Sequence, residues 1–106
     1  MITIDQVKAM ELRVATVKTA EAHPNADRLV VLRVDLGGEE RQIVAGIRAT
    51  YDPATLVGRQ IVVVANLEPA TLRGVESQGM LLAAAGEAGP ILVVPERLVP
   101  AGAVVR

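Results

Sequence analysis

The residues of this chain that could act as catalysts are few and do not form a set. His23 is the only histidine and stands before Pro24 in a turn-like stretch, where an isolated histidine is far more often structural or solvated than catalytic. Ser77 directly follows Glu76, and adjacent residues of a strand point to opposite faces, so the two do not form a nucleophile and its base. We therefore expect a protein that is not an enzyme.

Cofactor and metal sites are not predicted either. The glycines of "GVESQGM", residues 74–80, lack the Gly-Lys-Ser/Thr that completes a phosphate loop. Aspartate and glutamate occur singly rather than at the spacing of metal ligands, and the chain has no cysteine, which excludes disulfides and thiolate chemistry. We expect neither a cofactor nor a metal ion.

The composition and the N-terminus predict a cytoplasmic protein that does not enter a membrane. Residues 1–10 lack the basic region and apolar run of a secretory signal. The longest apolar run covers residues 61–65, far short of the roughly 20 residues that a membrane helix needs. The absence of cysteine fits a reducing compartment.

Arginine is the residue type best suited to binding a ligand here, because it is much more frequent than lysine. A planar guanidinium binds phosphate through two parallel hydrogen bonds and packs on sugar or base faces. Most of the arginines lie in the middle of the chain: Arg28, Arg33, Arg41, Arg48, Arg59 and Arg73. The formal net charge is only -1, so a polyanion would have to be recognised by a local cluster. Arginine on solvated faces is the alternative explanation.

A small all-β domain is expected to position these residues. The 106 residues fit one domain, residues 1–106, and the near absence of aromatic residues requires a core of Val, Leu, Ile and Ala, whose branched members favour strands. Five or six strands are predicted, at residues 11–23, 29–36, 39–46, 59–66, 80–85 and 91–95. The short turns between them favour an antiparallel barrel.

Local patterns support several of these elements. Residues 30–36 alternate between an apolar face and a face that carries Arg33, and Gly37-Gly38 predicts a hairpin turn after them. Thr3 and Gln6 have the spacing of a capping box and predict a short helix over about residues 4–9.

The remaining segments are predicted to be less regular. Residues 47–58 are expected to be irregular or briefly helical. Residues 67–79 are interpreted as a connection into the strand at 80–85, and residues 86–90 as a turn.

Two motifs, "HPNADRL" (23–29) and "GVESQGMLLAA" (74–84), resemble the tRNA-binding OB-fold family, and the segments around them follow the family in order. This family includes the C-terminal domain of bacterial methionyl-tRNA synthetase, free-standing structure-specific tRNA-binding proteins and EMAP II-like synthetase cofactors. The resemblance implies an all-β, five-stranded OB-fold barrel with short helical segments. It also implies a homodimer that binds the outside corner of folded tRNA with little sequence preference.

The resemblance further implies binding residues. The positions that match family motifs, with nearby arginines added as phosphate ligands, are Asn66, Arg73, Ser77, Gln78, Met80, Arg33 and Arg41. Ser77 and Gln78 are expected to face solvent and to offer donors and acceptors to sugar and phosphate, whereas Met80 is either a flexible contact or a core residue. Glu68 and Thr71 depart from the family, whose members commonly carry basic residues in this region.

The resulting hypothesis is an appended or trans-acting tRNA-binding module of an aminoacyl-tRNA synthetase, in the first place the methionyl enzyme. The apolar tail, residues 98–106, together with the N-terminal segment is the candidate dimer contact. Two alternatives stay open. One is an export-chaperone-like dimer of the same superfamily that binds unfolded peptides, and the other is an assembly module that docks a synthetase onto a partner.

Overall fold

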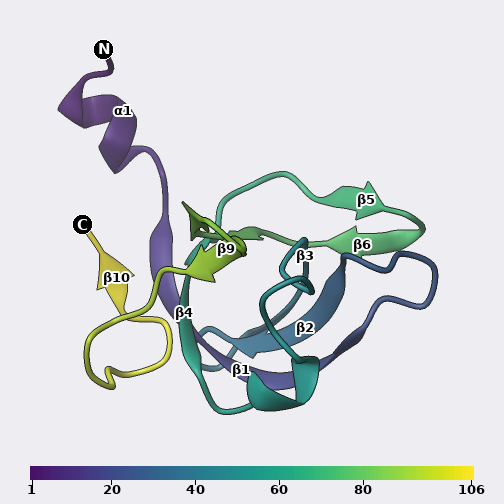
Figure 1. Ribbon diagram of the computed structural model, residues 1–106. Coiled ribbons are helices and arrows are strands. Elements are labelled where there is room, and N and C mark those ends of the chain that lie inside the picture. The colour runs from purple at the N-terminus through teal and green to yellow at the C-terminus, as the bar shows by residue number, and fades with distance from the viewer.

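A nearly closed five-stranded antiparallel barrel forms the body of the computed structural model, which describes residues 1–106 (Figure 1). Its strand order is β3-β2-β1-β4-β7. The bounds are β1 (Leu12–Ala22), β2 (Val30–Asp35), β3 (Glu40–Ala45), β4 (Gln60–Val64) and β7 (Met80–Leu81). The prediction of an all-β OB-fold barrel is confirmed.

Strand β1 is the longest and holds the barrel together. It pairs with β2 along one edge and with β4 along the other, and its first residues also pair with the C-terminal strand β10 (Val104–Val105). The register with β2 shifts between Val17 and Thr19, which is a β-bulge that bends the strand. The strand predicted at residues 11–23 is thereby confirmed.

The barrel core consists of branched aliphatic residues and alanine, as the composition requires. In β2 the side chains of Val30, Leu32 and Val34 are fully buried, whereas Arg33 is exposed, which confirms the predicted alternation. Residues from all five barrel strands contribute to the core, and the single aromatic residue, Tyr51, packs against it from outside.

The β2–β3 hairpin turns at Gly37-Gly38, as predicted. Both glycines have positive φ, at 85° and 98°. The Oδ1 atom of Asp35 accepts hydrogen bonds from the amides of Gly37 (2.8 Å) and Gly38 (3.2 Å), and these bonds lower the pKa of the Asp35 carboxyl.

Two short helical segments lie outside the barrel. Helix α1 (Ile4–Lys8) begins with the predicted capping box of Thr3 and Gln6, buries no residue and projects away from the barrel in Figure 1. The 3-10 turn η1 (Pro53–Thr55) lies within residues 47–58, the segment that was expected to be irregular or briefly helical. Neither element approaches the length and apolarity that a membrane-crossing helix requires.

The C-terminal half differs from the prediction in three places. Residues 67–79 are not a plain connection, because they contain a hairpin of β5 (Ala70–Leu72) and β6 (Val75–Ser77). The single strand expected at 80–85 is two, since the chain leaves β7 and starts β8 (Ala83–Gly86). Strand β9 (Gly89–Leu92) begins two residues before the expected last strand, because it pairs with β8 through a tight turn.

Candidate nucleic-acid interface

The motif around Ser77 lies where β3 meets the segment between β6 and β7. The Ser77 Oγ atom accepts a hydrogen bond from the amide of Val44 (2.9 Å) and donates one to the carbonyl of Gly79 (2.9 Å). Only 4% of Ser77 is exposed. The expectation that this side chain faces solvent is therefore wrong: the hydroxyl replaces ladder hydrogen bonds where the strands diverge, and it helps to close the barrel.

The neighbouring Gln78 has the same kind of role. The backbone amide of Gln78 donates to the backbone carbonyl of Gln42 (2.7 Å), and the side-chain Oε1 of Gln78 accepts from the backbone amide of Gln42 (3.0 Å). The Nε2 of Gln78 donates to the carboxylate of Glu76 (3.2 Å). Gln78 is half-buried with both ends of its side-chain amide bonded within the protein, so the expectation of an uncommitted, solvent-facing amide is wrong as well.

Arg41 completes this junction, which we call the barrel seam and define by Arg41, Gln42, Val44, Ser77 and Gln78. Its Nη1 donates to the carbonyls of Ala65 (2.7 Å) and Gln78 (3.2 Å). Its Nε donates to Glu39 (3.2 Å). The hydrogen bonds of the Arg41 guanidinium therefore connect β3 to Ala65, which follows β4, and to Gln78, which follows β6.

Two further candidates, Met80 and Arg33, lie at the surface. Met80 is 48% exposed, so it is not a core residue and its thioether is available for a contact. Arg33 is exposed on β2 and forms an ion pair with Glu40 at 3.6 Å. Gly79, between the seam and Met80, has a φ of 142°, and a Cβ there would lie 3.0 Å from the carbonyl oxygen of Val64. A glycine is required at that position.

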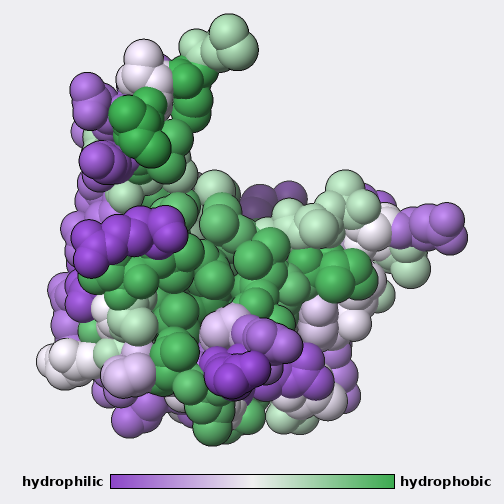
Figure 2. All heavy atoms as spheres, turned by 90° about the vertical axis from the view of Figure 1, so that its left-hand side faces the viewer, coloured by the Kyte–Doolittle hydropathy of each residue, from purple (hydrophilic) through white to green (hydrophobic).

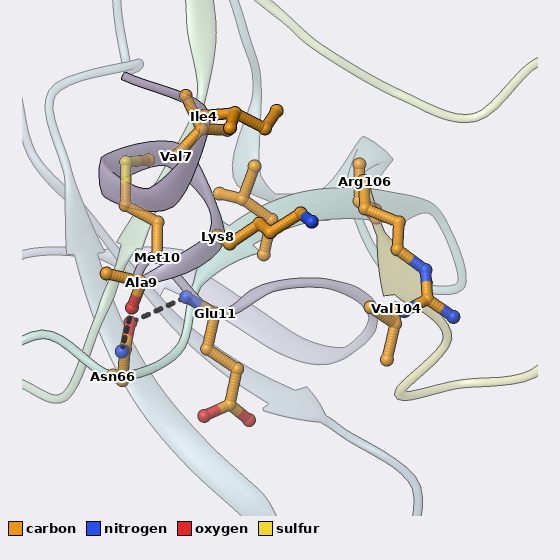
Figure 3. A pocket seen from close by; sticks show the side chains of 11 residues that line it. Ile4, Val7, Lys8, Ala9, Met10, Glu11, Asn66, Val104 and Arg106 are labelled. Carbon is orange, nitrogen blue, oxygen red and sulfur yellow. Dashed lines mark hydrogen bonds between the residues drawn. The ribbon is translucent and has the colours of Figure 1, made fainter. Parts of the chain in front are cut away.

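Asn66 follows β4 and lies beside α1 rather than beside Ser77. Its Oδ1 accepts from the amide of Glu11 (2.8 Å), and its Nδ2 donates to the carbonyl of Ala9 (2.8 Å), as Figure 3 shows. These bonds fasten the end of α1 to the barrel. The side chain of Asn66 is therefore bonded to the end of α1 and not to the seam, although the preceding residue, Ala65, accepts a hydrogen bond from Arg41 of the seam.

Arg73 lies at the turn of the β5–β6 hairpin. It is the only residue other than glycine with a positive φ, at 52°, and the next residue, Gly74, has a φ of 89°. Two positive φ values at the centre of a two-residue turn define a type I′ turn, which favours Asn-Gly or Gly-Gly. Holding an arginine in this conformation costs about 1 kcal/mol.

His23 is a structural residue, as its isolation in the sequence predicted. It is buried, its Nδ1 accepts from the amide of Asn25 (2.9 Å), and its Nε2 lies 3.0 Å from the carbonyl of Leu72. Because Nδ1 accepts, Nε2 carries the hydrogen and donates to Leu72. The imidazole therefore joins the β1–β2 loop to strand β5, a role that sequence reasoning did not identify.

An apolar groove lies between α1 and β10, where the N-terminal segment and the tail come together. Its volume is about 740 Å³, and Figure 3 shows the side chains around it. The apolar residues that line it are Ile4, Val7, Ala9, Met10, Leu12, Val104 and Val105. Figure 2 looks onto this side of the molecule and shows a broad hydrophobic surface below the projecting helix. The two segments that the sequence suggested as a dimer contact are thus adjacent.

No group of three or more His, Cys, Asp or Glu side chains comes close enough to hold a metal ion. The candidate residues have different surroundings: Arg41, Ser77 and Gln78 form the seam, Met80 follows it directly, Arg33 lies opposite Gln42 of the seam, Asn66 bonds to the end of α1, and Arg73 lies at the β5–β6 turn. The arrangement provides hydrogen-bonding and cationic surface on a rigid barrel.

Comparison with known proteins shows the family of the chain. Residues 12–104 match the family described as "Putative tRNA binding domain". The methionine–tRNA ligase of Methanothrix thermoacetophila is 55% identical over 106 residues, which are 100% of this chain and 16% of that protein. The chain thus spans about a sixth of the length of this relative.

Two solved structures have the same barrel. A MetRS-related protein from Pyrococcus horikoshii has a TM-score of 0.92 at 39% identity and covers 100% of this chain and 98% of its own. The chaperone CsaA from Bacillus anthracis str. Ames has a TM-score of 0.90 at 29% identity, covering 100% of this chain and 99% of its own. With the family match over nearly the whole barrel, these likenesses show that the chain belongs to the tRNA-binding domain family.

Proposed function

We propose that residues 1–106 act as one domain that binds folded tRNA without catalysing a reaction, as an appended or trans-acting module of an aminoacyl-tRNA synthetase. The observation that carries the proposal is the family match over residues 12–104 together with 55% identity to a methionine–tRNA ligase. Such a module raises the effective concentration of tRNA near the synthetase. A methionyl enzyme is the favoured partner, and the cytoplasm is where such a module works.

Recognition is proposed to follow the shape of the tRNA rather than individual bases. The chain has one aromatic residue, Tyr51, which is half-buried and has the Arg59 guanidinium 6.0 Å from its ring centre. Without aromatic platforms the protein lacks the usual device for stacking splayed bases. Contacts to phosphate and sugar from arginine and polar groups remain, and these suit a folded RNA.

In this proposal the predicted site residues act in two ways. Arg33, Arg73 and Met80 are exposed and contact RNA directly. Ser77 and Gln78 act through the seam, because their hydrogen bonds place the backbone that presents Met80.

The protein is further proposed to be a homodimer that joins through the α1 groove. Ile4 is 66% exposed, Val7 39% and Val104 62%, and α1 buries no residue of its own chain. An isolated helix of five residues is not stable in water, so the apolar side of α1 needs a surface to pack against. A second copy of this chain supplies an identical apolar surface, as a two-fold symmetric interface requires. Two copies also double the RNA-binding surface of a chain whose formal net charge is only -1.

Peptide binding is the second candidate function, because the apolar groove and the likeness to the CsaA chaperone both favour it. An unfolded segment would place its apolar side chains in the groove that the dimer proposal gives to a second protomer. The remaining alternative, a pure assembly module, predicts no affinity for tRNA in the isolated chain.

Filter binding of the isolated chain with bulk tRNA, duplex RNA and an unfolded peptide tests these functions together. We expect retention of tRNA in preference to duplex RNA, and no retention of the peptide. Retention of the peptide alone would support the chaperone function, and retention of none of the three would support the assembly module.

Glu68 offers a direct test of where the RNA backbone runs. It is exposed in the loop between β4 and β5, and its carboxylate would repel a nearby phosphate. Glu68→Lys should therefore bind tRNA more tightly at low salt, and the slope of log K against log salt should steepen by roughly 0.7 to 0.9 for each phosphate that the new lysine neutralises.

Glu96→Lys is the matched control for this charge change. Glu96 is exposed in the C-terminal segment and pairs with Arg97 at 3.6 Å. If the two variants change the affinity and the slope equally, only the overall charge counts, and the β4–β5 loop does not border the RNA.

A further inference from the structure

The motif at residues 23–29 has no part in the function proposed above, yet it forms one wall of a surface depression. The depression has a volume of about 470 Å³ and is lined by Asn25, Ala26, Asp27, Arg28, Leu29 and Arg73. The first five residues belong to the β1–β2 loop, and Arg73 belongs to the β5–β6 turn. Figure 1 shows this loop and this hairpin together on the side of the barrel away from α1 and β10.

The two walls are held together by hydrogen bonds that cross between them. His23 Nε2 donates to the carbonyl of Leu72 (3.0 Å), and Arg73 Nη2 donates to the carbonyl of Asn25 (3.2 Å). A third bond, from the amide of Arg48 to the carbonyl of Arg28 (3.3 Å), fixes the loop from its other side. The depression is therefore shaped before any ligand arrives, which reduces the ordering cost of binding.

The depression carries a net positive charge, and neither of its arginines forms an ion pair. The four ion pairs of the structure involve Arg13, Arg33, Arg41 and Arg97, so neither Arg28 nor Arg73 has a carboxylate partner. One carboxylate, that of Asp27, shares the depression with the two guanidinium groups. Arg48 adds a third guanidinium to the neighbouring loop.

The backbone of Arg73 is an independent sign of function. Its φ of 52° lies in the left-handed region, where asparagine or glycine would be less strained. Backbone strain at a residue for which an easier choice exists points to a role for its side chain.

We propose that the β1–β2 loop and the β5–β6 turn form a phosphate-binding site, with Arg28 and Arg73 as ligands to the RNA backbone. The site rests on the proposed tRNA function and extends it, because it gives a role to Arg28 and to the loop of residues 23–29. Two guanidinium groups without carboxylate partners, placed across a preformed depression, suit a phosphodiester, which accepts hydrogen bonds from both sides. The contact carries no base information, so it serves every tRNA alike.

The test measures tRNA affinity of the full chain across a salt series for Arg28→Gln, Arg73→Asn and the double variant. Arg73→Asn suits the test because asparagine fits the type I′ turn, which offsets the loss of the bond from Arg73 to the carbonyl of Asn25, so the melting temperature should change little. Each single variant is expected to weaken binding at low salt about three- to tenfold and to flatten the salt slope by roughly 0.7 to 0.9. Arg97→Gln is the control, because it removes the same charge from an exposed residue that does not line the depression.

The outcomes separate this site from the broader function. If the unaltered chain binds tRNA but Arg28→Gln and Arg73→Asn behave like Arg97→Gln, the phosphate site is wrong while the tRNA function stands. If the unaltered chain does not bind tRNA, the proposed function fails first. A loss of affinity with an unchanged slope would also overturn the site, because it would mean that no phosphate contact was removed.

Discussion

Ser77→Ala is expected to lower the free energy of unfolding by about 2–4 kcal/mol, because it leaves two buried backbone groups without partners. The amide of Val44 loses its acceptor, and the carbonyl of Gly79 loses its donor. Val44, Ser77 and Gly79 are all buried, so water cannot replace the hydroxyl without opening the seam. Urea denaturation followed by circular dichroism measures the loss.

Thr19→Ala is the matched control, since it also removes a hydroxyl from a strand residue. Thr19 is exposed in β1, and such surface substitutions change stability by no more than about 0.5 kcal/mol. If Ser77→Ala is as stable as Thr19→Ala but binds tRNA less tightly than the unaltered chain, the Ser77 hydroxyl contacts RNA directly. The structural role given to Ser77 in the seam would then be wrong.

Val7→Asp is expected to convert the dimer to a monomer and to weaken tRNA binding about a hundredfold, because a second RNA-binding surface adds avidity of this size. The carboxylate would have to be buried in the α1 groove of the dimer, at a high desolvation cost. In a lone protomer the same change is harmless, since α1 buries no residue. Sedimentation equilibrium gives the oligomeric state, and filter binding gives the affinity.

Val57→Asp controls for the added charge. Val57 is also an exposed valine, and it lies beyond η1, outside the α1 groove. A Val7→Asp protein that still sediments as a dimer would contradict the proposed interface. A protein that becomes monomeric without losing tRNA affinity would contradict the avidity argument, and loss of peptide binding alone would favour the chaperone function.

The elements that sequence analysis predicted correctly depend on neighbouring residues. The capping box needs only Thr3 and Gln6, and the β2–β3 hairpin needs only the alternation before Gly37-Gly38. Each of these patterns spans only a few residues, so the local sequence is sufficient to predict the element. The strand at residues 11–23 was also predictable, because this segment is rich in residues that favour strands.

The features that could not be predicted from the sequence depend on residues far apart in the chain or on an unusual pair of residues in a turn. Ser77 bonds to Val44 across 33 positions, and Arg41 bonds to Ala65 across 24, so their burial follows from how the barrel closes. The β5–β6 hairpin was missed because Arg73-Gly74 is not a favoured type I′ pair. The side chains of Ser77 and Gln78 were predicted to bind a ligand, but in the structure they form hydrogen bonds within the barrel seam.

The construction of the seam has a consequence for motion. A single main-chain hydrogen bond, from Gln78 to Gln42, crosses it, whereas β1 and β2 are joined along a six-pair register. A junction held mainly by side chains opens at a lower free energy than a continuous ladder, so the amide hydrogens of Gln42 and Val44 should exchange with deuterium before those inside β2. Each such opening frees the β5–β6 hairpin from β3 while the rest of the barrel stays intact, and an RNA bound to both sides of the seam would slow that exchange.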